Sequence, residues 1–115
     1  RQMCIRDSLQ NGTAGNAQLK GYQLSGKTGT AQKVDPNTGA YSNSAYWITF
    51  AGIAPADDPR FVVAVMVDEP KSGVEDNGGG GQSAAPIFRD IASWLLNRDN
   101  IPTSKPAPRL TLRAQ

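Results

Sequence analysis

The chain has no histidine and a single cysteine among its 115 residues. Without histidine, its own residues cannot form a Ser-His-Asp or Cys-His catalytic site, and one thiol without imidazoles leaves no cluster to hold zinc. Cys4 has no partner for an intramolecular disulfide, so we assign it no role. The composition therefore predicts no metal site, and we expect no cofactor.

Long hydrophobic runs and charge of one sign are also missing. No run reaches the roughly 18 apolar residues of a membrane span, and the start at Arg1 shows no secretory signal pattern. The formal net charge is +2, and the basic residues are dispersed instead of forming a stripe interleaved with aromatics. Nucleic acid is therefore not expected as a partner. A hydrophobic content of 38% is typical of a globular piece with one modest core.

Residues 21–28 spell G-x-x-x-x-G-K-[ST], the letters of a phosphate-binding loop. That loop needs a buried strand before it and a helix directly after it, so that backbone N–H groups can surround phosphates. Gly12–Lys20 is too polar and glycine-rich for a central parallel strand, and the turn residues Val34–Gly39 leave no room for a helix. We therefore reject an NTPase.

The same stretch contains the triplet Lys27–Gly29, which in penicillin-binding proteins and serine β-lactamases lies on a strand that lines the active-site cleft. Here the flanking residues agree with a strand. Apolar and polar residues alternate from Tyr22 onward, which places Gln23, Ser25 and Lys27 together on the polar face. Alternatively, Lys27 is a solvated lysine and the threonines are ordinary strand formers without a function in binding. The rest of the chain has to decide between the two interpretations.

Four blocks, in order, resemble the transpeptidase domain of class B penicillin-binding proteins. They are Gly21–Lys33, Phe50–Phe61, Val65–Pro70 and Gly79–Phe88. The sequences of these blocks are most similar to those of division-type (septal) members, and elongation-type members share most of the blocks. The resemblance implies an α+β fold of the penicillin-binding and serine β-lactamase type, with antiparallel strands and a C-terminal helix packed on the sheet. The chain would be a C-terminal fragment of that transpeptidase domain.

Two strand-like runs, Trp47–Ala54 and Phe61–Val67, are separated by a linker too short for a crossover, which predicts an antiparallel hairpin. The second run is apolar at every position. Both faces of the sheet are therefore expected to be covered, by helices of this chain or of a portion beyond it.

From Ala84 the apolar residues recur at helical spacing, with Pro86 in the first turn. This pattern predicts a helix that packs on the sheet. Its predicted apolar face consists of Ile87, Phe88, Ile91, Ala92, Trp94 and Leu95.

The resemblance also divides the chain. Residues 1–10 form an atypical lead-in, and we interpret Arg1–Ser8 as an assembly or cloning artefact because family members carry an apolar helical segment there. Residues 11–100 correspond to the C-terminal part of the transpeptidase domain. Residues 101–115 are predicted to be a flexible, proline-rich basic tail, and Gly78–Gly81 a mobile loop.

The chemistry that the resemblance implies is acyl transfer through a serine ester. In the family, the serine of a Ser-x-x-Lys motif attacks the D-Ala-D-Ala bond of a peptidoglycan stem peptide, and an amine of a neighbouring stem resolves the acyl-enzyme. β-Lactam antibiotics mimic the dipeptide. Neither Ser-x-x-Lys nor the family's Ser-x-Asn occurs in this chain, so the chain alone is predicted to be inactive.

For the longer protein, the resemblance implies partners among division or elongation cell-wall proteins. It also implies a place on the extracytoplasmic face of the cell membrane, with the anchor upstream. A non-catalytic sensor module of the same fold, which binds β-lactam or peptidoglycan, is the alternative.

The resemblance assigns substrate binding to Lys27, Thr28, Gly29 and Thr30. The ammonium of Lys27 and the two threonine hydroxyls would meet the terminal carboxylate of the stem peptide, and Gly29 would let an extended substrate lie close. The backbone N–H of Thr30 would be one oxyanion-hole donor, with the missing serine supplying the other. Since Lys27 and Thr28 point to opposite faces of an ideal strand, a twist or a bulge would be needed to bring both into the cleft.

Overall fold

The computed structural model describes residues 15–70 and 82–104. In chain order, the elements are the short 3-10 helix η1 (Gly15–Ala17), the strands β1 (Ser25–Val34), β2 (Tyr41–Ala54) and β3 (Phe61–Asp68), and the helix α2 (Ala84–Arg98). The predictions for residues 1–10, for Gly78–Gly81 and for residues 105–115 lie outside the described residues.

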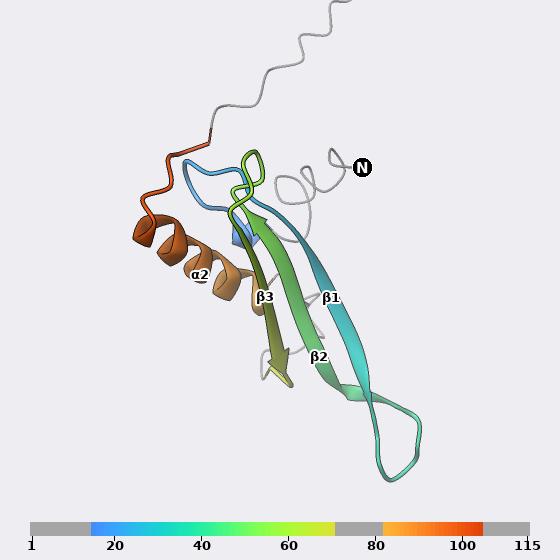
Figure 1. Cartoon of the computed structure of the whole chain (residues 1–115). Helices are drawn as coiled ribbons and strands as arrows, with labels where there is room; N and C mark the ends of the chain where they lie inside the picture. The colour runs from blue at the N-terminus through green and yellow to red at the C-terminus, as the bar shows by residue number, and fades with distance from the viewer. Residues whose placement is uncertain (1–14, 71–81, 105–115) are drawn as a thin grey trace, which may run out of the picture.

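The strands form one antiparallel sheet in the order β1-β2-β3. The first hairpin turns at Asp35, whose carboxylate accepts the N–H of Asn37 at 2.8 Å and whose carbonyl accepts the N–H of Gly39 at 2.8 Å. Gly39 has φ +69°, which glycine adopts at no steric cost. Because this turn comes late, β1 and β2 run on past the end of β3, and their hairpin projects from the sheet (Figure 1).

The second hairpin confirms the predicted antiparallel pairing of the two apolar runs, with Ala54 opposite Phe61 and Trp47 opposite Asp68. Two boundaries differ from the prediction. β1 begins at Ser25 instead of Tyr22, and β2 begins at Tyr41, well before Trp47. The polar stretch from Tyr41 lacks the apolar run used to predict a strand, yet it extends β2 because the far end of β1 pairs with it at Val34.

Helix α2 packs across one face of the sheet, as predicted, and the predicted apolar face is only partly the buried one. The buried side chains are Ala84, Ala85, Phe88, Ala92 and Leu96. Three residues of the predicted apolar face, Ile87, Ile91 and Trp94, are exposed. The helix carries two neighbouring apolar stripes, and the buried one combines three alanines with Phe88 and Leu96.

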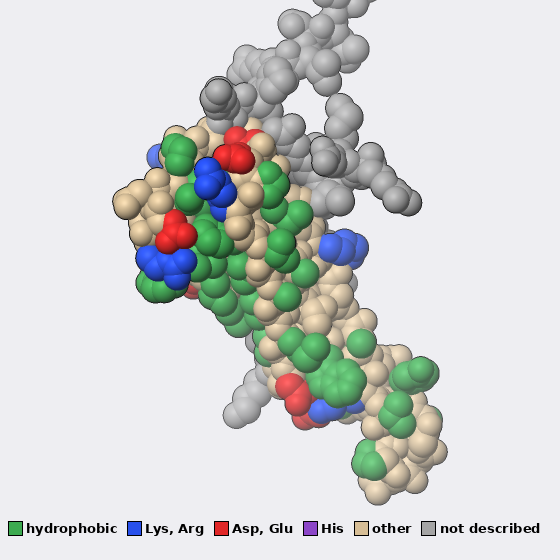
Figure 2. All heavy atoms as spheres, viewed as in Figure 1, with side chains coloured by type: hydrophobic (Ala, Val, Ile, Leu, Met, Phe, Trp, Pro, Cys, Tyr) green, Lys and Arg blue, Asp and Glu red, His purple; other side chains and the backbone are tan. Residues whose placement is uncertain are grey.

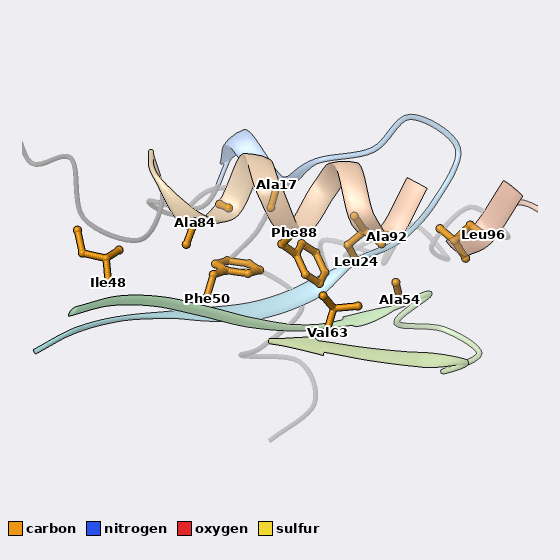
Figure 3. Close-up of a cluster of buried hydrophobic side chains, with 11 residues drawn as sticks. Ala17, Leu24, Ile48, Phe50, Ala54, Val63, Ala84, Phe88, Ala92 and Leu96 are labelled. Atoms are coloured by element: carbon orange, nitrogen blue, oxygen red, sulfur yellow. The ribbon is translucent and has the colours of Figure 1, made fainter. Parts of the chain in front are cut away.

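Phe50 of β2 and Phe88 of α2 form the centre of the core (Figure 3). Their ring centroids lie 4.8 Å apart with the planes tilted by 49°. Glycines make room for both rings: a Cβ at Gly26 would lie 2.6 Å from the Phe50 ring, and one at Gly52 would lie 2.5 Å from the Phe88 ring. These paired glycines of β1 and β2 leave a hollow in the sheet that the aromatic rings fill.

We call the side of the sheet under α2 the covered face and the opposite side the open face. Side chains of the open face remain exposed among the described residues: Val62 is 77% exposed, Met66 68% and Trp47 44%. Figure 2 shows hydrophobic side chains gathered along the sheet on this side. The prediction that both faces are covered therefore holds for one face of the described structure.

The chain beyond α2 turns back to the start of β1. Ser104 donates its N–H to the carbonyl of Gly21 at 2.9 Å, and the hydroxyl of Tyr22 donates to the carbonyl of Ile101 at 2.6 Å. Residues 101–104, assigned from the sequence to a flexible tail, thus hydrogen-bond to the segment that leads into β1.

Candidate functional site

The residues expected to bind substrate lie consecutively along β1, one of the two outer strands of the described sheet. Lys27 lies opposite Ala51, Thr28 opposite Phe50, and Thr30 opposite Ile48. The register is continuous from Ser25 to Gln32, so no bulge occurs in this stretch. Lys27 and Gly29 therefore belong to the open face, and Thr28 and Thr30 to the covered face.

The ammonium of Lys27 is exposed and donates a hydrogen bond to the carbonyl oxygen of Thr28 at 2.7 Å. No carboxylate takes part in this contact. Because the described partner of the ammonium is an adjacent backbone oxygen at the surface, an incoming carboxylate could replace that acceptor with a charge-assisted hydrogen bond.

Gly29 has a structural role that the sequence did not reveal. A Cβ at this position would lie 2.5 Å from the hydroxyl oxygen of Thr49, directly across on β2. That hydroxyl instead donates to the carbonyl of Gly29 at 3.3 Å. The missing side chain thus admits a cross-strand threonine, in addition to any closeness it gives a substrate.

Ser25 shares a face with Lys27, as the alternation predicted, but it is only 6% exposed. The loop after β2 lies beside this end of the strand, held by the N–H of Ala56, which donates to the carbonyl of Gln23 at 2.6 Å. Beyond Lys27, the same face carries Gly29 and the exposed Ala31, so the polar alternation does not continue along the strand.

The segment after Lys27 is strand through Val34. A phosphate-binding loop would require a helix there, with its N-terminal N–H groups around the phosphates. The rejection of that pattern agrees with the observed backbone.

The outer edge of β1 is the place at this site where an extended peptide could bind. Among the described residues, β2 is the strand that pairs with β1, so the other side of β1 is an edge of the described sheet. An extended peptide laid along such an edge gains backbone hydrogen bonds, and it lies between the side chains of both faces. Lys27 from one face and Thr28 and Thr30 from the other could then contact the same ligand without any bulge.

The start of β1 is fixed by residues far away in sequence. The hydroxyl of Ser104 accepts the N–H of Gln23 at 2.8 Å and donates to a carboxylate oxygen of Asp57 at 2.7 Å. Sequence reasoning missed both residues, because no local pattern links a serine after the last helix to an aspartate in the second hairpin.

Within residues 15–70 and 82–104, no group of three or more His, Cys, Asp or Glu side chains could hold a metal ion. The same ranges contain no helix that is long and apolar enough to cross a membrane.

Comparison with known proteins gives the same picture. The family model of the penicillin binding protein transpeptidase domain matches residues 2–93. The penicillin-binding protein PbpB of Mycolicibacterium smegmatis is 53% identical over 117 residues, which cover 99% of this chain and 18% of that protein. Peptidoglycan D,D-transpeptidase FtsI of Escherichia coli K12 is 40% identical over 94 residues, which cover 82% of this chain and 15% of that protein.

A solved structure shares the fold. The crystal structure of penicillin-binding protein 3 from Mycobacterium tuberculosis, complexed with ampicillin, superposes with a TM-score of 0.76 at 45% identity, over 99% of this chain and 26% of that one. This likeness confirms the predicted fold class. The chain spans less than a fifth of the two curated relatives.

Proposed function

Because the chain belongs to the penicillin-binding protein transpeptidase family, we propose that it is the C-terminal part of a peptidoglycan D,D-transpeptidase. We call the longer protein that carries it the parent protein. The parent cross-links stem peptides through a serine acyl-enzyme and is acylated by penicillin. Its nucleophile, in a Ser-x-x-Lys motif, lies outside this chain, so the chain supplies the substrate-binding strand and is inactive alone.

One observation carries the proposal: Lys27, Thr28, Gly29 and Thr30 lie together on an outer strand, with the lysine exposed and bound to no carboxylate of the described residues. The stem peptide, ending in D-Ala-D-Ala, lies extended along the outer edge of β1. Its terminal carboxylate replaces the Thr28 carbonyl as the acceptor of the Lys27 ammonium, and the hydroxyls of Thr28 and Thr30 donate to it. A charge-assisted contact of this kind is worth about 1.5–3 kcal/mol.

The backbone N–H of Thr30 is the oxyanion-hole donor that this chain contributes, and the N–H of the nucleophilic serine is the second. Such donors stabilise the negative oxygen of the tetrahedral intermediate more than the ground-state carbonyl. Removing one of them typically slows catalysis by about 100- to 1000-fold. Because a backbone N–H cannot be deleted by side-chain mutation, the geometry of β1 determines how well it works.

The parent acts in septal cell-wall synthesis, on the extracytoplasmic face of the cell membrane, with its anchor upstream of this chain. Its partners are peptidoglycan stem peptides, β-lactam antibiotics and proteins of the division machinery. The septal role rests on the resemblance of the four sequence blocks to division-type members, and the identity to FtsI and PbpB supports the penicillin-binding transpeptidase.

The test is Lys27→Ala in the parent protein, with the rate of acylation by a fluorescent penicillin as the measurement. Loss of about 1.5–3 kcal/mol predicts a second-order rate constant lower by about 10- to 100-fold. The thermal midpoint should stay within a few degrees, because Lys27 is exposed and contacts only backbone. The matched control is Lys20→Ala, an exposed lysine outside the strand, which should acylate as the parent does.

Equal acylation rates in Lys27→Ala and the unchanged parent would contradict the role of Lys27. A parent that binds penicillin reversibly but forms no covalent adduct would instead favour the alternative, a non-catalytic sensor module of the same fold. Absence of any penicillin binding would contradict both functions.

A further inference from the structure

A cluster of charged and aromatic side chains lies at the far end of β1, away from Lys27–Thr30. The ammonium of Lys33 lies 2.9 Å from Oδ1 of Asp68 and 2.7 Å from Oε1 of Glu69. The same ammonium lies 5.5 Å from the centroid of the Trp47 ring. Lys33 is on β1, Trp47 on β2, and Asp68 is the last residue of β3. The contacts therefore cross all three strands on the open face, and Figure 2 shows acidic and basic side chains together at the end of the sheet.

The geometry holds the ammonium of Lys33 in one place. Its side chain is 24% exposed, whereas those of Asp68 and Glu69 are 64% and 56% exposed. The hydrogen bond to Glu69, followed by that to Asp68, raises the pKa of Lys33 above the ordinary 10.5, so the lysine is charged at neutral pH. A single exposed ion pair adds little to stability, but two acceptors and an aromatic ring together define a position.

The strand pairing is interrupted where Lys33 lies. Gln32 pairs with Tyr46, but the next pair is Val34 with Tyr41, so the register shifts between them. On the β2 side, the hydroxyl of Ser42 accepts the N–H groups of Ser44 and Ala45 at 3.2 and 3.1 Å. These hydrogen bonds are local to residues 42–45 and do not reach β1. Such irregularities typically redirect a side chain. The link from Lys33 to the end of β3 therefore crosses the sheet where the β1–β2 ladder is broken.

The backbone of Glu69, one of the two acceptors of the Lys33 ammonium, is also held in place. Glu69 has φ +46°, a backbone conformation that is uncommon outside glycine. Its N–H donates to the carbonyl of Tyr46 at 3.0 Å, which fixes the residue against β2. An uncommon conformation held by surrounding contacts is a frequent mark of a functional constraint.

We infer that Lys33 is a positioning residue for the acyl transfer, which means that this inference rests on the proposed function. Lys33 anchors the far end of β1 to β3 and thereby fixes the backbone of the segment Lys27–Thr30. Thr30 lies three residues away, about 10 Å at the rise of a strand. Because an oxyanion-hole donor works only when it is aimed at the place where charge develops, a strand that shifts by fractions of an ångström loses rate before it loses its fold.

The experiment replaces Lys33 by methionine in the parent protein, which keeps the length of the side chain and removes its charge. Acylation by a fluorescent penicillin is followed over a range of concentrations to separate the limiting rate constant from the half-saturating concentration. We expect the limiting rate constant to fall roughly 3- to 10-fold, short of the about 100-fold cost of a 1 Å misplacement. The half-saturating concentration should change by less than about twofold, because ground-state binding is retained.

Several variants identify the cause. Lys33→Arg, which can keep both ion pairs, should restore the rate to within about twofold of the parent's. The double variant Asp68→Asn with Glu69→Gln should match Lys33→Met, and adding Lys33→Met to it should lower the rate no further. Glu69→Gln alone serves if Lys33→Met fails to fold. Lys20→Met is the matched control and should leave every value unchanged.

A parental rate in Lys33→Met, with the parent itself acylated, would overturn this inference and leave the proposed function standing. A fall in rate that tracks the thermal midpoint and that Lys33→Arg does not restore would also overturn it, since the lysine would then be merely structural. A parent that is never acylated would overturn the proposed function and this inference together.

Discussion

The two faces of the sheet are built from similar residues and are put to different uses. On the covered face, the rings of Phe50 and Phe88 fill the hollow above Gly26 and Gly52, and no exposed lysine is present among the described residues of β1 on that side. On the open face, apolar side chains such as Val62 stay exposed, beside Lys27 and Lys33. Within the described residues, one face is therefore committed to packing, and the ammonium of Lys27 projects from the other.

The largest expected effect on stability comes from removing a large buried side chain from the core on the covered face. Phe88→Ala in the parent should lower the free energy of unfolding by about 3–5 kcal/mol, because a fully buried aromatic side chain is removed from contact with Phe50. Urea unfolding of the parent measures it. Asp90→Ala on an exposed part of the same helix should cost less than about 0.5 kcal/mol. Comparable losses in the two variants would show that α2 is not docked as described.

Gly29→Ala tests whether the open face needs its glycine for packing or for substrate. The new Cβ would overlap the hydroxyl of Thr49, so we expect a loss of about 1–3 kcal/mol in the free energy of unfolding of the parent. Thr49→Ala in the same protein removes that hydroxyl and should restore most of the stability. Acylation by penicillin then distinguishes the roles: a rate that stays low in the restored double variant assigns Gly29 to substrate approach, and a recovered rate assigns it to packing alone.

Val62 and Val63 are adjacent in β3 and lie on opposite faces, so substituting each allows the stability contributions of the two faces to be compared directly. Val63 is buried under α2, so Val63→Ala should cost the parent about 1–2 kcal/mol. Since β3 is apolar from Phe61 to Val67, we expect the rest of the parent to bury Val62, and Val62→Ala to cost a similar amount. Urea midpoints of the two variants provide the comparison. A cost below about 0.5 kcal/mol for Val62→Ala would mean that the open face stays in contact with water.

The smallest effect concerns the protonation of Lys33. Its pKa is raised above 10.5 by the hydrogen bonds to Glu69 and Asp68. A lysine whose folded pKa is raised stabilises the fold fully below its ordinary pKa, and that contribution is lost as the pH rises through the raised value. NMR titration of the Lys33 ammonium should therefore give a midpoint above 10.5. The variant with Asp68→Asn and Glu69→Gln should shift it down, and an unchanged midpoint would contradict the pairing.

The sequence predicted the elements whose pattern is local. The run of β3, the short linker before it and the helical spacing from Ala84 are each contained in a few consecutive residues, and all three agree with the structure. The extent of β2 was underestimated because its polar first part is a strand only by virtue of its partner. The apolar face of α2 was predicted correctly for Phe88 and Ala92 but not for Ile87, Ile91 and Trp94, because the pattern records hydrophobicity and not which apolar residues meet the sheet.

The residues of the candidate site also differ in whether a local sequence pattern predicts them. Lys27–Thr30 could be proposed from a motif, because its residues are adjacent and their spacing on a strand is fixed. The groups that hold β1 in place could not, since Lys33 meets Asp68 across 35 positions of sequence and Gln23 meets Ser104 across 81. Only the register of the sheet and the return of the chain after α2 bring these residues together.

The bond between Gln23 and Ser104 also bears on biosynthesis. A ribosome makes Gln23 first and Ser104 81 residues later, so the start of β1 cannot gain this contact until nearly all of the described chain has been translated. The strand that carries Lys27 is thus made early and secured late. A nascent chain arrested before Ser104 would hold the complete motif on a strand that lacks this anchor.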